Sequence, residues 1–161
     1  MGRIVTTVDI ENLTAAGKSK KIDVLVDTGA SYLTLPLAWK EQFGFFNTEE
    51  PVDLQTATQA VVKGTVCGPV RIRVEGFRAV YNEVLFLDME PNGDEYEPLL
   101  GYIVLEQCGA AVDMIGHRLV PVKYMDLKAA PTEHFSGGPR QRRGSIQPPH
   151  GTAAPEQEAQ K

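Results

Sequence analysis

The sequence has 161 residues, of which 42% are hydrophobic, a content typical of a globular protein with a packed core. Its formal net charge of -5 argues against a general nucleic-acid-binding protein, whose contact face is usually basic. Two cysteines are too few for a disulfide framework, and we expect both to be buried in a reducing compartment. We find neither a signal-peptide core nor the roughly 18 apolar residues of a spanning helix, so we expect a cytoplasmic protein with no membrane partner.

The first part of the chain alternates apolar and polar residues, as strands with one buried face do. Residues 4–10 predict a first strand, and residues 13–19 predict a turn. Residues 22–26 alternate again and predict a second strand that delivers an acid to a tight turn. A short helix is predicted at residues 36–43, because it has proline at its first position and Gly44 after its end.

The second part of the chain adds mostly strands. A second short helix is predicted over residues 102–108, stopped by Gly109. Further strands are predicted at residues 61–66, 70–74, 79–87, 111–115 and 119–122. Many short strands with one or two short helices indicate the all-β class and a small closed β-barrel.

The composition changes near residue 129. Proline and glycine become frequent after that point, and large apolar residues almost disappear. Such a segment buries too little surface to offset the entropy lost on ordering. We therefore predict a folded domain over residues 1–128 and a disordered tail over residues 129–161. The basic run at residues 140–143 is interpreted as part of that solvated tail.

The most informative segment is the turn that follows the second strand. It consists of Asp27, Thr28, Gly29, Ala30 and Ser31. Glycine permits a sharp turn and a close approach by another chain, while the hydroxyls and backbone N–H groups can donate to the carboxylate. For the tripeptide taken alone, an ordinary Asp-Thr-Gly turn between strands is the favoured interpretation, since such turns are common by composition.

Two segments together carry a resemblance to a known family. The Asp27–Ser31 turn, with the apolar strand before it, resembles the active-site loop of aspartic peptidases. Residues 98–106, Pro-Leu-Leu-Gly-Tyr-Ile-Val-Leu-Glu, resemble the apolar-apolar-Gly element that packs beneath that loop in retropepsin-like peptidases. The resemblance covers about residues 3–124. It implies a retropepsin-type β-barrel, Asp27 as the catalytic acid, a polypeptide substrate, and neither metal nor cofactor.

The single Asp-Thr-Gly implies how the site is completed. Two carboxylates that share a proton are needed to activate water, and Asp88, Asp94 and Asp113 lie in settings typical of surface acids. The resemblance therefore implies a homodimer that pairs Asp27 with its symmetry mate and uses Thr28 to brace the two-fold axis.

Three features depart from the viral members of the family. Those enzymes close a hairpin flap, often glycine-rich at its tip, over the substrate; the resemblance implies that residues 54–64 form this hairpin, but they have no glycine cluster. Ser31 stands where many viral enzymes carry a second aspartate, and Tyr102 stands in place of an arginine.

Two other interpretations remain open. The first is a non-catalytic dimerisation or peptide-binding module with the same fold, and the second is an unrelated small β-barrel with a chance Asp-Thr-Gly. The histidines at 117, 134 and 150 are too scattered to indicate a metal site or a triad, and Trp39 is interpreted as a packing residue.

Overall fold

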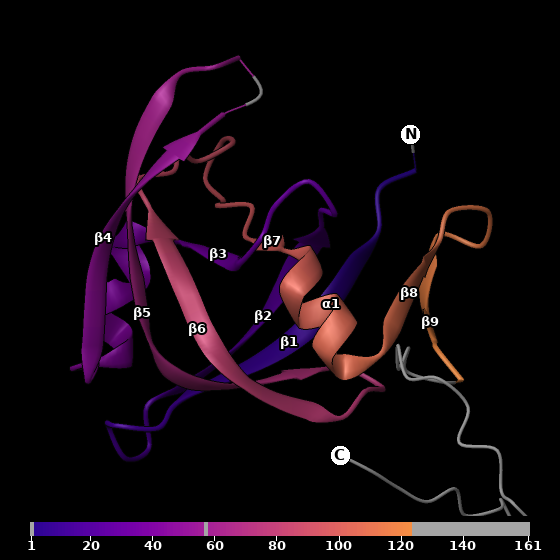
Figure 1. The fold of residues 1–161 in the computed structure, drawn as a ribbon, viewed down its shortest axis with the longest axis horizontal. Coiled ribbons are helices and arrows are strands. Elements are labelled where there is room, and N and C mark those ends of the chain that lie inside the picture. The colour runs from indigo at the N-terminus through magenta and orange to yellow at the C-terminus, as the bar shows by residue number, and fades with distance from the viewer. Residues whose placement is uncertain (1, 57, 124–161) are drawn as a thin grey trace, which may run out of the picture. The chain divides into compact units, whose positions relative to one another are not determined.

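The computed structural model describes residues 2–56 and 58–123, which form nine strands and two short helices (Figure 1). The all-β class predicted from the sequence is confirmed. Within the same residues, no helix is long and apolar enough to cross a membrane. The predicted tail at residues 129–161 lies outside the described residues, and so does its predicted boundary with the folded domain.

Seven of the described strands form one sheet. They are β1 (Val5–Asn12), β2 (Ser19–Val26), β3 (Leu33–Pro36), β4 (Thr48–Gln55), β5 (Val61–Val74), β6 (Ala79–Leu87) and β7 (Leu99–Leu100). Their order along the sheet is β1-β2-β7-β3-β6-β5-β4, and β1 also pairs with β5. This extra pairing closes all of these strands except β4 into a ring, the closed sheet that the sequence predicts.

The other described strands, β8 (Ala110–Asp113) and β9 (Arg118–Pro121), form an antiparallel hairpin. Helix α1 (Tyr102–Cys108) has its predicted bounds and ends at Gly109, whose φ of 73° lies in the left-handed region that favours glycine. Helix η1 (Leu37–Phe43) is a 3-10 helix that begins one residue after the predicted start, because Pro36 has an extended backbone and caps it.

One strand replaces the two predicted over residues 61–66 and 70–74. Strand β5 runs through both segments, and its register against β6 shifts between Cys67 and Val70. Pairing continues across the shift because β4 lines the first half of β5 and β1 lines the second half. The predicted break is therefore an irregularity inside one long strand.

The inner face of the ring holds the hydrophobic core. The alternation in β1 buries Val8 and Ile10 completely, as one-sided strands require. Three phenylalanines from separate segments meet there: the ring centroids of Phe43 and Phe86 lie 5.9 Å apart, and those of Phe46 and Phe86 lie 5.7 Å apart. Each such buried side chain contributes roughly 1.5–3 kcal/mol, so this cluster ties η1 to the sheet.

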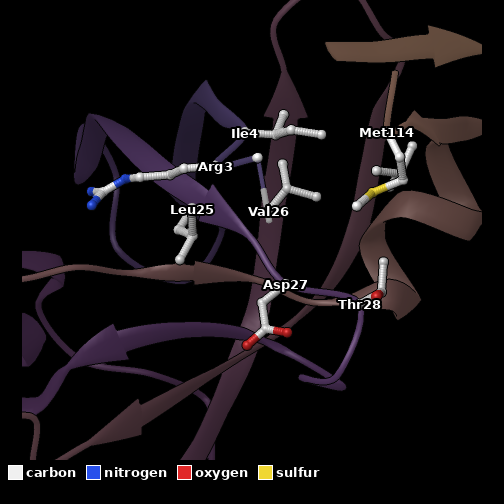
Figure 2. A pocket seen from close by; sticks show the side chains of 9 residues that line it. Arg3, Ile4, Leu25, Val26, Asp27, Thr28 and Met114 are labelled. Atoms are coloured by element: carbon white, nitrogen blue, oxygen red, sulfur yellow. The ribbon is translucent and has the colours of Figure 1, made fainter. Parts of the chain in front are cut away.

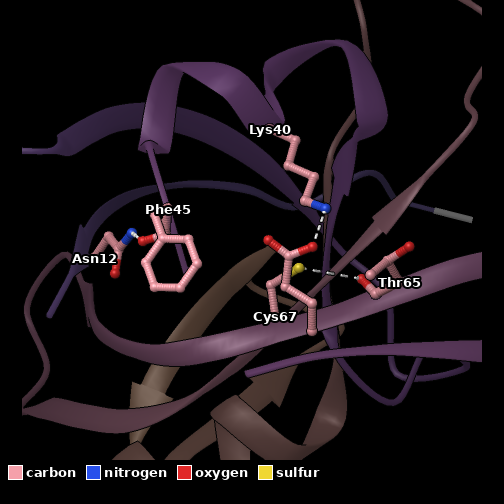
Figure 3. A network of polar contacts seen from close by, with 6 residues as sticks. Asn12, Lys40, Phe45, Thr65 and Cys67 are labelled. Carbon is pink, nitrogen blue, oxygen red and sulfur yellow. Dashed lines mark hydrogen bonds and ion pairs between the residues drawn. The ribbon is translucent and has the colours of Figure 1, made fainter. Parts of the chain in front are cut away.

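A buried amide fixes the end of η1. The side-chain nitrogen of Asn12 donates to the carbonyl oxygens of Phe43 and Phe45, both at 2.8 Å. Figure 3 shows the bond to Phe45. The bond to Phe43 satisfies a carbonyl at the end of the helix, and the other joins a bond from the Thr14 hydroxyl to the Phe45 carbonyl at 2.9 Å. The segment after η1 is thereby held against β1, which sets the path of the chain into β4.

Both cysteines are buried and free, as the sequence predicts. Cys67 lies on β5 near Thr65 and Lys40 (Figure 3), and burial raises the pKa of its thiol to about 11. Burial also raises the pKa of Cys108 at the end of α1. Because the thiolate is the reactive form, these side chains act as small apolar groups.

Candidate active site

Asp27 follows directly after β2. Strand β2 buries Val24 on its core side, which fixes the direction in which the chain enters the turn. The backbone N–H of Asp27 donates to the carbonyl oxygen of Leu100 at 3.1 Å. One residue earlier, the N–H of Val26 donates to the carbonyl oxygen of Ile4 at 2.9 Å. The backbone that carries the carboxylate is therefore held by two other segments.

The turn itself donates a hydrogen bond to one oxygen of the Asp27 carboxylate. The N–H of Gly29 donates to Oδ1 of Asp27 at 2.8 Å, and the N–H of Ala30 donates to the Asp27 carbonyl at 3.2 Å. Oδ2 of Asp27 accepts no hydrogen bond from the described residues. The Thr28 and Ser31 side chains are exposed, and within the same part of the chain the Ser31 hydroxyl makes no bond to Asp27. The arrangement leaves Oδ2 available to a water or a second acid.

The second predicted segment lies beneath the first. Strand β7 pairs with β2 through Leu99 and with β3 through the same residue, so it separates the two strands that flank the Asp27 turn. A Cβ on Gly101 would lie 2.4 Å from the carbonyl oxygen of Tyr32 and 2.5 Å from the carbonyl carbon of Ser31. Only glycine fits at this contact between two backbones.

The start of α1 continues this support. The N–H of Tyr102 donates to the carbonyl oxygen of Ala30 at 2.9 Å, and the N–H of Ile103 donates to that of Ser31 at 3.2 Å. The first N–H groups of a helix have no partner inside the helix, so the Asp27 turn satisfies them. The two motifs that the sequence singles out are therefore in direct backbone contact.

A hairpin forms where the sequence predicts it, over residues 54–64, from the ends of β4 and β5. The N–H of Thr56 donates to the carbonyl oxygen of Ala60 at 2.9 Å, and Gln59 has a φ of 63°. In Figure 1 the hairpin tip and the turn between β2 and β3 both point to the upper edge of the view. We call residues 54–64 the flap.

Gly64 lies where the flap joins the ring. A Cβ at this position would lie 2.7 Å from Cδ1 of Leu85 and 3.2 Å from Cδ1 of Leu54. The absence of a side chain lets a leucine of β4 and a leucine of β6 approach each other across β5. The base of the flap is therefore apolar and closely packed.

A pocket of about 320 Å³ borders the turn on another side. Arg3 and Ile4 line it together with Asp27, Thr28 and Val112 of β8. Figure 2 shows the Arg3 side chain and the Asp27 carboxylate pointing in different directions. Arg3 forms an ion pair with Glu97 on the segment before β7. The arginine charge is thus directed to Glu97 and not to the carboxylate of the turn.

The other predicted surface acids hold structural or exposed positions. Asp88 and Asp94 are exposed. Asp113 accepts hydrogen bonds from the N–H groups of Ile115 at 3.1 Å and Gly116 at 2.8 Å. The Gly116 bond is the main cause that holds the pKa of Asp113 below its usual range. Asp113 thus ends a strand and accepts from the backbone N–H two residues on, as Asp27 does, but its other oxygen pairs with Arg118 at 3.3 Å.

The remaining candidates take no part in the turn. His117 is exposed, and His134 and His150 lie outside the described residues. Trp39 packs edge-on against Tyr96, with ring centroids 5.9 Å apart, and the Lys20 ammonium lies 4.0 Å from its ring centre. The packing role predicted for Trp39 is confirmed. Within residues 2–56 and 58–123, no three His, Cys, Asp or Glu side chains gather as a metal site.

Sequence patterns miss two contacts that build the site. The sequence singles out residues 98–106 but not the bond in which the carbonyl oxygen of Pro98 accepts from the N–H of Leu25 at 2.8 Å, which aligns β7 with β2. Ile4 and Met114 line the pocket beside Thr28, although they come from opposite ends of the described chain. Neither contribution leaves a signal in the sequence, because both depend on long-range placement of ordinary residues.

Comparison with known proteins gives a family and a fold. A family model described as aspartyl protease matches residues 7–104, a range that contains both the Asp27 turn and the Leu99–Gly101 segment. Among solved structures, the chain is similar to EIAV protease complexed with the inhibitor HBY-793, with 22% identity and a TM-score of 0.52. That match covers 70% of this chain and 93% of the EIAV protease chain, and it shows the fold.

A second solved structure is a retropepsin-like aspartic protease from Rickettsia conorii, with 23% identity and a TM-score of 0.28. The match covers 70% of this chain and 88% of the Rickettsia protein. Comparison with the curated proteins finds no match.

Proposed function

Because this chain belongs to the aspartyl protease family, we propose that it is an aspartic endopeptidase whose site is completed by a second copy of the chain. The Asp27 turn is the observation that carries the proposal. One oxygen of its carboxylate accepts a hydrogen bond from the Gly29 N–H, and the other oxygen is left available. The backbone N–H of Asp27 is held by the carbonyl oxygen of Leu100. An oxygen left available on a firmly held acid is what a group that transfers protons to and from water needs.

The proposed reaction uses two Asp27 carboxyl groups that share one proton. The ionised member takes a proton from a water molecule, whose oxygen attacks the carbonyl carbon of the scissile peptide bond. The protonated member donates its proton to the carbonyl oxygen, giving a tetrahedral diol. The acid that took the water proton then gives it to the amide nitrogen, while the other carboxylate takes a proton from the diol. The C–N bond breaks, two peptides leave, and the pair again carries one proton. Gly29 contributes by fixing Oδ1, so that each acid keeps its orientation through both transfers.

The homodimer, the polypeptide substrate and the location belong to the same proposal. One Asp-Thr-Gly in the whole sequence supports a site shared between two identical subunits. Two free, buried cysteines suit a reducing compartment, and we place the activity in the cytoplasm.

Dilution tests the shared site. Each subunit supplies half of the dyad, so specific activity is expected to fall as the concentration drops below the dimer dissociation constant, by mass action. The measurement compares peptide cleavage per subunit with the dimer fraction from analytical ultracentrifugation, over the same concentrations. Constant specific activity far below that dissociation constant would mean that one chain holds a complete site.

The pH profile tests the proton-sharing pair. Activity requires that the pair carry one proton, so kcat/KM is expected to be bell-shaped with its maximum on the acidic side of neutrality. Cleavage of a model peptide is measured across the pH range, with a pepstatin-type inhibitor as the control for the aspartic class. A single rising limb with its midpoint near about pH 7 would point to a histidine base and contradict the proposal.

A further inference from the structure

The pocket beside the turn has an apolar lining on the face that Thr28 shares. We call it the Thr28 pocket. Its apolar side chains come from the N-terminal segment, β2, β8 and the turn that follows β8: Ile4, Leu25, Val26, Val112 and Met114. Figure 2 shows Ile4, Val26 and Met114 around the space above Thr28. The pocket therefore combines a strand that carries the catalytic acid with two segments from the opposite ends of the described chain.

A rigid turn next to the pocket exposes a large apolar side chain. The turn joins β8 to β9, and Asp113 fixes it by accepting from two backbone N–H groups and by pairing with Arg118 at 3.3 Å. Ile115 at its tip is 94% exposed, and the neighbouring Met114 is 51% exposed. A lone exposed apolar residue needs no explanation, but this one stands on a fixed turn beside an apolar pocket.

Apart from Asp27, the charged side chains beside this surface named here have partners. Arg3 pairs with Glu97, and Asp113 pairs with Arg118. The N-terminal segment also lies against this turn: Gly2 is so close to the imidazole of His117 that a Cβ on Gly2 would overlap it. A partner that covers the pocket would therefore meet apolar side chains at its centre and paired charges at its rim, the usual anatomy of a specific protein interface.

We propose that a second copy of the chain covers this surface, with Ile115 of each subunit entering the Thr28 pocket of the other. The inference rests on the proposed function, since a dyad brings two Asp27 turns together about a two-fold axis. Two acids that share a proton lie about 3 Å apart, so exposed groups beside the turn face the partner. Ile115 and the Thr28 pocket lie on one surface, which suits an isologous contact, because each subunit then inserts its Ile115 into the pocket of the other.

The test uses the full-length chain with Ile115→Asp, which places a charge where the proposal needs an apolar side chain. Phe45→Asp is the matched control, since Phe45 is 72% exposed and lies between η1 and β4. Ile115→Asp is expected to raise the dimer dissociation constant at least about tenfold, as loss of a central interface side chain does. Phe45→Asp is expected to change it by less than about twofold, as a residue outside the interface does.

Sedimentation equilibrium gives the dissociation constants, and circular dichroism verifies that each variant is folded. If Ile115→Asp does not fold, Ile115→Ser is measured in the same way. An unchanged dissociation constant for the Ile115 variant, or equal weakening by both variants, would overturn the assignment of this surface while an active wild-type dimer upholds the proposed function. A wild-type chain that cleaves peptides as a monomer would overturn both.

Discussion

Replacing Asp27 by asparagine is expected to lower kcat/KM for peptide cleavage at least about a thousandfold, within the range that general acid–base groups contribute. In a homodimer the substitution removes both acids at once, so no carboxyl remains to take or give a proton. The fold is expected to persist, because the asparagine side-chain oxygen can still accept from the Gly29 N–H as Oδ1 does now. The measurement is cleavage of a random peptide library, with thermal unfolding in parallel.

Asp23→Asn is the matched control for that substitution. Asp23 lies on the same strand, is exposed, and its Oδ1 accepts from the Thr7 hydroxyl at 2.8 Å. It takes no part in the turn, and its replacement is expected to leave cleavage unchanged. Wild-type activity in the Asp27 variant, in a preparation free of other peptidases, would end the case for an aspartic mechanism.

Replacing Gly101 by alanine is expected to damage both stability and catalysis. The new Cβ would meet the backbone of Tyr32 and Ser31 at 2.4–2.5 Å, and neither atom belongs to a side chain that can turn away. The segment must shift, which costs about 1–3 kcal/mol as overpacking does. Because the same segment supports the Asp27 turn, a displacement of about 1 Å there is expected to lower kcat/KM about a hundredfold.

Gly17→Ala separates these two effects. Gly17 has a φ of 73° and nothing within 4 Å of a Cβ, so alanine there costs about 1–2 kcal/mol through the backbone alone. Urea unfolding gives the stability of both variants, and kcat/KM is measured under conditions where each is folded. We expect normal kcat/KM for Gly17→Ala. A normal value for Gly101→Ala as well would show that the contact beneath the turn does not position the acid.

The sequence predicts the Asp27 turn because local rules are sufficient there. Alternation over residues 22–26 defines the strand, and an acid followed by glycine defines the turn. Helix α1 is equally local, since Gly109 ends it through a left-handed backbone. By contrast, the sequence of η1 predicts a helix but does not indicate that it winds as a 3-10 helix and not as an α-helix.

Strand β7 shows what local rules leave out. It has two residues, too few for any periodicity, and it is a strand only because β2 and β3 pair with Leu99 on either side. Strand β5 is a similar case. Gly68 and Pro69 indicate the end of a strand in the sequence, but β5 continues past them because it pairs with β4 before them and with β1 after them. The Thr28 pocket depends on where distant segments meet, which single-sequence patterns do not encode.

The neighbours of β5 change along its length. From Val61 to Lys63 it pairs with β4 alone, and from Gly64 onward β6 pairs with it as well. A ribbon of two strands has fewer cross-strand hydrogen bonds to hold it than a sheet of three, so we expect the flap to bend at Gly64 and not within the ring. Bending there would separate Leu54 from Leu85, which meet across Gly64, and would leave the ring pairings intact. Under the proposed function, we expect these apolar contacts, and not the stability of the sheet, to set how often a peptide can enter.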